Sequence, residues 1–129
     1  MVIQKSYVEE ATIFLRLTSI ILVTWAVTFL LSLVVGTICL GHIPVYGIDK
    51  DPNSLNSFLL DTIYWINFLS FFFSFFAFFA WPFLLMHLLI YKVVFSYNER
   101  LLQAGALLSI LTFFMFKLVW AEQFSWHYD

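Results

Sequence analysis

The side chains best suited to bind a metal or a haem are His42, His87, His127 and Cys39. The single cysteine excludes an internal disulfide and a metal site made of cysteines alone. His87 lies within a long apolar segment, where a lone histidine can ligate a haem, relay protons or form a hydrogen bond at a helix interface. We expect the interfacial role, and keep a haem or quinone at His87 as the alternative.

A metal site is the next chemistry to consider, because the segment from Asp49 to Asn53 begins like a calcium-binding loop. Such a loop needs a glycine at its sixth position and a glutamate at its twelfth, and here these positions hold Ser54 and Leu60. His42 and His127 fall on the same predicted side of the membrane as several acids. We nevertheless expect the segment from Asp49 to Asn53 to form a turn, and we expect no metal site.

Catalytic patterns are missing from the sequence. The four glycines are scattered, so there is no phosphate-binding loop or dinucleotide fingerprint. No serine, histidine and acid are spaced for nucleophilic catalysis, and no basic run could neutralise the phosphates of a nucleic acid. We expect no enzymatic activity and no nucleic-acid partner.

The elements that position these residues follow from hydropathy. The chain is 63% hydrophobic and 11% charged, with a mean hydropathy of +0.94. Three apolar runs, at residues 17–40, 62–91 and 101–121, each exceed the roughly 20 helical residues that cross a ~30 Å hydrocarbon core. The sequence predicts an all-α integral membrane protein with three transmembrane helices and no soluble domain. Pro82 predicts a kink in the second span.

Basic residues set the expected orientation. Four of them fall on the side of the N-terminus and two on the other side: Lys5, Arg16, Lys92 and Arg100 against Lys50 and Lys117. Positively charged loops stay inside. We therefore expect the N-terminus inside and the C-terminus outside, in a bacterial inner (plasma) membrane or a mitochondrial inner membrane.

Capping signals mark where two of the helices begin. Asn53 or Ser54 is expected to cap the second span, since both side chains can accept hydrogen bonds from a helix N-terminus. The second signal is the pair Ser96 and Glu99, whose spacing is that of a capping box. We expect it to open the third helix after a short loop.

Small residues along the spans predict helix-packing faces. In the first span they recur at every fourth position and so form one stripe, which lets another helix approach closely. The third span has a shorter version. These packing residues are Thr24, Thr28, Ser32 and Gly36 in the first span, and Gly105 and Ser109 in the third.

The second span has two different faces. On a helical wheel, Phe68, Phe72, Phe75, Phe76, Phe79 and Phe83 share one sector. The opposite sector contains the small or polar residues Asn67, Ser70, Ser74 and Ala77, together with Trp81. Because an amide is costly against lipid, we expect this second sector to contact protein and the phenylalanine sector to contact lipid or a partner.

Two charges near the membrane borders need partners. Lys117 lies about one turn from the outer end of the third span, and Asp61 lies at the outer start of the second. We predict an ion pair between them, or else between Lys117 and an acid of a neighbouring subunit, with Glu122 as the other local option. Snorkelling of Lys117 alone is the alternative. At the inner side, Arg16 can pair with Glu99 or with an anionic lipid headgroup, and the sequence does not choose between these.

The outline of the chain resembles the membrane anchors of succinate dehydrogenase. The resemblance is carried by three spans, by Arg16-Leu17-Thr18-Ser19 ahead of the first span, and by His87 late in the second. The arginine and serine come in a different arrangement from that of the family. The resemblance implies electron transfer, with His87 near a haem b shared with another subunit or near a quinone.

We expect a non-catalytic accessory or scaffold subunit of a larger membrane complex, whose partners are larger membrane subunits and lipid. The two alternatives are the electron-transfer anchor and a self-assembling lipid-binding or channel-like protein.

Overall fold

The computed structural model describes residues 2–55 and 57–128, among which the regular elements are helices joined by loops, with no strand. The elements are α1 (Val2–Leu40), a short 3-10 turn η1 (Pro52–Ser54), α2 (Phe58–Ile90), α3 (Tyr97–Leu118) and α4 (Ala121–Tyr128). Three helices, α1, α2 and α3, are long and apolar enough to cross a membrane. The fourth helix, α4, follows the third span, in a segment where no helix was expected.

Helix α1 begins well before the predicted span. It has 39 residues and no glycine or proline before Gly36, so nothing interrupts it between the charged N-terminal segment and the apolar run. At 1.5 Å per residue it is about 58 Å long, which exceeds a ~30 Å hydrocarbon core. Gly41 follows the last helical residue with φ +77°, a left-handed conformation that glycine adopts freely, and ends the helix.

Helix α2 starts later than its expected cap. The N-cap is Ser57, whose hydroxyl accepts a hydrogen bond from the Leu60 amide at 3.2 Å. The expected cap at Asn53 or Ser54 is therefore wrong, because both residues belong to the separate turn η1. Pro82 lies inside α2, which continues beyond it to Ile90.

Helix α3 begins with the predicted capping box, which is confirmed. The Ser96 hydroxyl accepts from the Glu99 amide at 3.3 Å, and the Ser96 amide donates to the Glu99 carboxylate at 3.2 Å. The same carboxylate accepts from Arg16 Nε at 2.9 Å, and the two side chains form an ion pair. Arg16 thus joins α1 to the start of α3.

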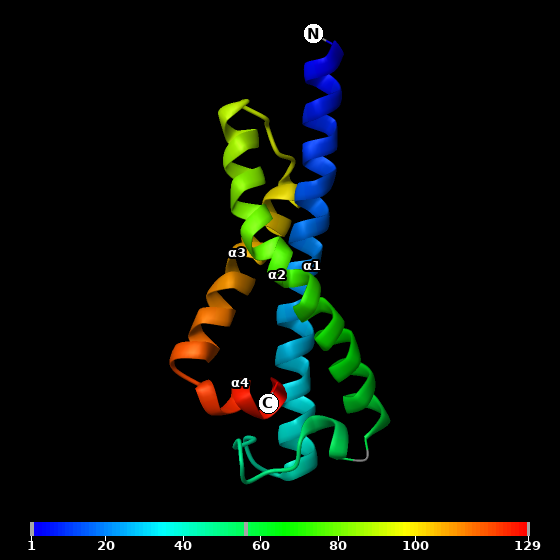
Figure 1. The fold of residues 1–129 in the computed structure, drawn as a ribbon, viewed down its shortest axis with the longest axis vertical. Helices are drawn as coiled ribbons and strands as arrows, with labels where there is room; N and C mark the ends of the chain where they lie inside the picture. The colour runs from blue at the N-terminus through cyan, green and yellow to red at the C-terminus, as the bar shows by residue number, and fades with distance from the viewer. Residues whose placement is uncertain (1, 56, 129) are drawn as a thin grey trace.

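Helix α1 is the centre of the arrangement, as Figure 1 shows. It contacts both α2 and α3, and α2 crosses it at an angle. The N-terminus and the α2–α3 loop lie at one end of the molecule (Figure 1). The loop between α1 and α2 lies at the other end, together with α4, which folds back toward α1. The two ends of the chain therefore lie at opposite ends of the bundle.

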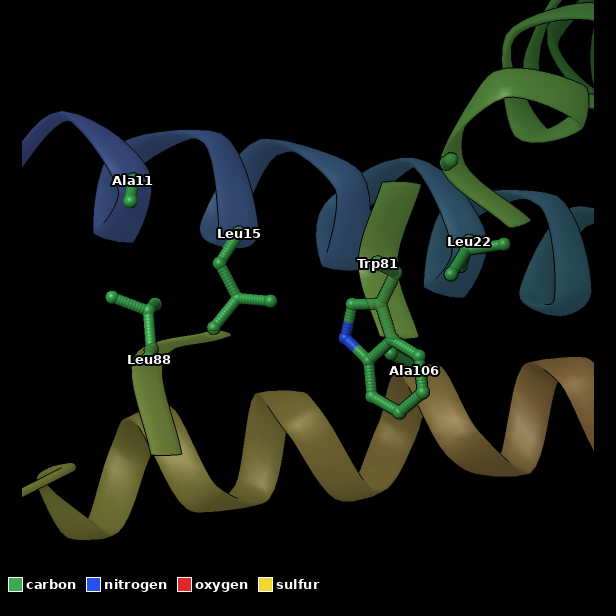
Figure 2. Packing of buried hydrophobic residues seen from close by; sticks show 7 residues of the cluster. Ala11, Leu15, Leu22, Trp81, Leu88 and Ala106 are labelled. Atoms are coloured by element: carbon green, nitrogen blue, oxygen red, sulfur yellow. The ribbon is translucent and has the colours of Figure 1, made fainter. Parts of the chain in front are cut away.

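Buried apolar side chains form two clusters. The first joins α1, α2 and α3 near the N-terminal end, and Figure 2 shows the indole of Trp81 beside Ala106. Its buried members are Ala11, Leu15, Leu22, Ala77, Trp81, Leu88 and Ala106. The second lies near the opposite end and brings α4 against α1; its buried members are Trp25, Ala26, Phe29 and Phe124.

A polar contact accompanies the first cluster. The side-chain oxygen of Gln103 accepts from Trp81 Nε1 at 2.6 Å and from the Ser19 hydroxyl at 3.0 Å. These three side chains come from α3, α2 and α1, and all are buried. Because a buried amide oxygen without a partner is costly, this contact specifies how the three helices meet.

Candidate functional site

Helix α4 is packed against the rest of the chain. Trp126 Nε1 donates to the Lys50 carbonyl at 2.8 Å, and Gln123 Nε2 donates to the Pro44 carbonyl at 3.0 Å, so the α1–α2 loop binds α4 from one side. The Trp126 ring lies on Gly36 of α1. A Cβ at Gly36 would stand 2.5 Å from the Trp126 ring, so only glycine permits this approach.

Asn67 lies at the centre of a buried polar cluster between α1, α2 and α4. Its amide nitrogen donates to the Trp25 carbonyl at 2.8 Å and to the Thr28 hydroxyl at 2.9 Å. Its amide oxygen accepts from the Tyr128 hydroxyl and from His127 Nε2 at 2.8 Å. Both hydrogens and both lone pairs of a fully buried amide are therefore used.

His127 and Tyr128 are the ionisable side chains of this cluster. His127 Nε2 donates, because the Asn67 oxygen can only accept, and His127 Nδ1 lies 3.0 Å from the Ser32 hydroxyl. Burial lowers the pKa of His127 to about 3, and the ring is therefore neutral near pH 7. Burial likewise raises the pKa of Tyr128, whose hydroxyl also accepts from Trp25 Nε1 at 2.6 Å. We call Trp25, Thr28, Ser32, Asn67, His127 and Tyr128 the Asn67 cluster.

The order Ser32, His127, Asn67 is formally that of a nucleophile, a base and an orienting group. Its geometry fits a structural role better. The relative exposure of each of the three residues is 2% or less. Ser32 faces Nδ1 and also bonds the Phe29 carbonyl at 2.8 Å, and the third group is an amide rather than a carboxylate. The hydrogen bonds of His127 to Ser32 and Asn67 join α4 to α1 and α2.

The expected packing residues divide into two groups. Six are buried within the chain: Ser32, Gly36, Asn67, Ser74, Ala77 and Ser109. Of the other four, Thr28 binds Asn67, and a Cβ at Gly105 would be 3.1 Å from Val23. Thr24 and Ser70 line a groove of about 240 Å³ between α1 and α2.

The two faces of α2 differ in exposure. Asn67, Ser74, Ala77 and Trp81 are buried. The six phenylalanines of the opposite sector are exposed, with relative exposures of 44% at Phe68 to 70% at Phe76. The chain itself thus leaves the phenylalanine face uncovered.

Lys117 and Asp61 do not form the predicted ion pair in the described part of the chain. The Lys117 ammonium lies 4.9 Å from the centre of the Phe124 ring, because α4 folds back past the end of α3. One carboxylate oxygen of Asp61 is buried and has no hydrogen-bond partner among the described residues.

The other two histidines each contact another side chain of the chain. His87 Nε2 lies 2.9 Å from the Tyr7 hydroxyl, and the Tyr91 and Phe83 rings lie beside the imidazole. His42 binds both carboxylate oxygens of Asp49, at 2.9 and 3.0 Å. Among residues 2–55 and 57–128, no three histidine, cysteine or acidic side chains gather in a way that could hold a metal.

Sequence reasoning missed several of the residues that hold the helices together, namely Ser19, Gln103 and Tyr128. The spacing of the sequence could have predicted a packing role for Gln103, since Gln103, Ala106 and Ser109 recur every third residue and share one helix face. All three are buried. His127 had no such signal, because it lies beyond the last apolar run.

No protein-family model, curated protein or solved structure matches this chain. Its function is therefore inferred from its own residues and contacts.

Proposed function

We propose that this chain is a non-catalytic accessory or scaffold subunit that packs against larger proteins in the membrane. The main support is that the chain buries only a small part of its own apolar helices. In the most apolar stretch of each span, the share of residues buried within the chain is 33% in α1, 17% in α2 and 11% in α3. Most of α2 and α3 is thus free to contact lipid or another protein.

The groove between α1 and α2 is the part of this surface best suited to a protein partner. It combines the hydroxyl residues Thr24 and Ser70 with the aliphatic side chains of Ile21 and Leu69. The Ser70 hydroxyl bonds to the Ile66 carbonyl of its own helix, so Ser70 presents a short side chain whose polar group already has a partner. Short side chains allow a second helix to approach closely in a membrane, where packing rather than the hydrophobic effect drives association.

We further propose that the N-terminus faces inside, in an inner or plasma membrane, on the strength of the basic residues at that end. Lys5 and Arg16 belong to the first half of α1, and Lys92 and Arg100 belong to the α2–α3 loop and the start of α3. The N-terminus and the α2–α3 loop lie at the same end of the bundle (Figure 1).

Purification of the tagged full chain in a mild detergent tests the proposal. We expect one or more larger membrane proteins to co-purify in fixed stoichiometry. Thr24→Phe fills the groove and should release them, whereas Phe72→Leu, on the exposed opposite face, should keep them. A chain that purifies alone, as a monomer or a homo-oligomer, overturns the proposal.

The electron-transfer alternative has a separate test. His87 would have to give up its bond to Tyr7 before Nε2 could ligate iron. A Soret band in the purified material that disappears in His87→Ala would favour the anchor over the scaffold.

A further inference from the structure

A cavity of about 170 Å³ lies between the three spans. Its lining includes Leu22, which belongs to the first buried cluster, and Trp25, which belongs to the second. The cavity therefore interrupts the packing between the two clusters. The atoms that line an empty apolar space lack van der Waals contacts on one side, so an apolar occupant would stabilise this part of the bundle.

The lining is suited to hydrocarbon. Eight of its ten residues are aliphatic or aromatic. The two others, Ser74 and Ser109, donate their hydroxyls to carbonyls of their own helices, Phe71 and Gly105, each at 2.8 Å. Without free polar groups the space does not favour water. An enclosed cavity of about 150 Å³ lined by leucine, isoleucine and phenylalanine is known to stay dry and to bind small apolar molecules.

The cavity extends from the interior to the surface of the spans. At its inner side, Leu22 and Trp25 are 3% and 2% exposed. At its outer side, Phe75 and Phe79 are 64% and 68% exposed. These rings belong to the phenylalanine face of α2, so the opening faces outward from the bundle.

The depth of the cavity indicates which part of a lipid can enter. Leu22 and Trp25 follow Leu17, the start of the first apolar run, by five and eight residues. At 1.5 Å per residue they lie about 8–12 Å inside a ~30 Å hydrocarbon core. Acyl chains occupy this depth, whereas headgroups do not.

We propose that this cavity is a binding site for one acyl chain of a membrane phospholipid. The chain enters past Phe75 and Phe79 and lies against Leu22 and Trp25, completing the packing between the two buried clusters. The site does not depend on the accessory role proposed above, because it needs only this chain and a bilayer.

Photolabelling of the full chain in phosphatidylcholine vesicles tests the site. A small fraction of the lipid carries a diazirine in the middle of one acyl chain, and the adducts are located by mass spectrometry. We expect adducts on Leu22 and Trp25. The matched comparison is with Leu15 and Leu88, which are equally buried but do not line the cavity, and which should stay unlabelled.

Two variants extend the test. Ser109→Phe fills the cavity and should abolish labelling of Leu22 and Trp25, whereas Leu108→Phe, at an exposed neighbouring position, should leave it unchanged. Ser74→Leu fills the same space from α2 and replaces Ser109→Phe if that variant does not fold. The proposal is overturned if wild-type labelling is confined to exposed rings, if Leu15 and Leu88 are labelled as strongly, or if labelling persists in the filled variants.

Discussion

Asn67 shows how a single polar residue inside a span is made stable. It faces protein, as its cost against lipid predicts, and its four hydrogen bonds reach α1 and α4. The partners on α4 are His127 and Tyr128, 60 and 61 residues away in the sequence. The energetic role of Asn67 is therefore to join distant segments rather than to stabilise its own helix.

Replacing Asn67 by alanine should lower the free energy of unfolding by about 1–3 kcal/mol, because its buried partners lose their hydrogen bonds. Unfolding in detergent, followed by circular dichroism, measures the change. Ser70→Ala on the same helix is the control and should change stability by less than about 0.5 kcal/mol, since the Ser70 hydroxyl bonds only to its own helix. Equal losses of unfolding free energy in the two variants would contradict the role of Asn67 in joining α2 to α1 and α4.

Acid should weaken the packing of α4. His127 has a pKa of about 3 when packed and an ordinary value of 6.5 when released, so the released form takes up the proton first. Packing is then at full strength above about pH 6.5 and weakens by about 1.4 kcal/mol per pH unit as the pH falls toward 3. The groups facing the ring are Asn67, Ser32, Phe29, Tyr64 and Tyr128, with no acid among these contacts.

Hydrogen exchange of residues 121–128, corrected for the intrinsic pH dependence, measures this effect. Exchange should rise below pH 6.5 in the wild type. His127→Gln should remove that rise, and His42→Gln, in the exposed loop, should retain it. A rise that survives in His127→Gln would show that another group is responsible.

At the scale of elements, α4 is the main departure from expectation. Its sequence contains tryptophan and tyrosine near a membrane border, which is typical of an interfacial belt. The structure instead buries Phe124, Trp126 and His127 against α1 and the α1–α2 loop. An aromatic residue after a span can lie at the membrane interface or pack against the bundle. Here Trp126 packs against the bundle because Gly36 leaves room for its ring.

Gly36→Leu should release α4, because its side chain would occupy the space of the Trp126 ring. We expect faster hydrogen exchange in residues 121–128 and easier proteolysis after α3. Gly105→Ala is the matched control: its Cβ meets only a flexible Val23 methyl at 3.1 Å, and α4 should stay protected. Unchanged protection in Gly36→Leu would mean that Trp126 does not hold α4.

At the scale of the whole molecule, α1 organises the bundle, and two polar contacts specify where the other helices meet it. Gln103 joins α3 to α1 and α2 near one end, and Asn67 joins α2 to α1 and α4 near the other. Between them lies the apolar cavity. The spans are thus fixed at two levels and remain less tightly packed in between.

The two ends of the bundle should lie on opposite sides of the membrane. In a Cys39→Ser background, Ser54→Cys should react with a membrane-impermeant thiol reagent in intact cells. Ser6→Cys should react only after permeabilisation. The native Cys39 is exposed and would otherwise react itself. Labelling of both positions from the same side would contradict three spans, and reversed labelling would contradict the orientation.

Local patterns in the sequence determined the helices and their faces. The lengths of the apolar runs predicted three spans, since hydropathy and the 1.5 Å rise act residue by residue. Helical spacing separated Asn67 and Ser74 from the phenylalanine face, and the Ser96–Glu99 spacing located the start of α3. Each of these properties depends on neighbours within a few residues.

Which distant groups meet depends on how the helices pack against one another in three dimensions. In the folded chain Arg16 pairs with Glu99, and Lys117 lies over Phe124 instead of beside Asp61. His127 contacts Asn67 and Ser32. Such partners depend on where helices cross and on the space that residues such as Gly36 leave open. Crossing points are properties of two packed surfaces together, so the spacing of residues along one helix does not contain them.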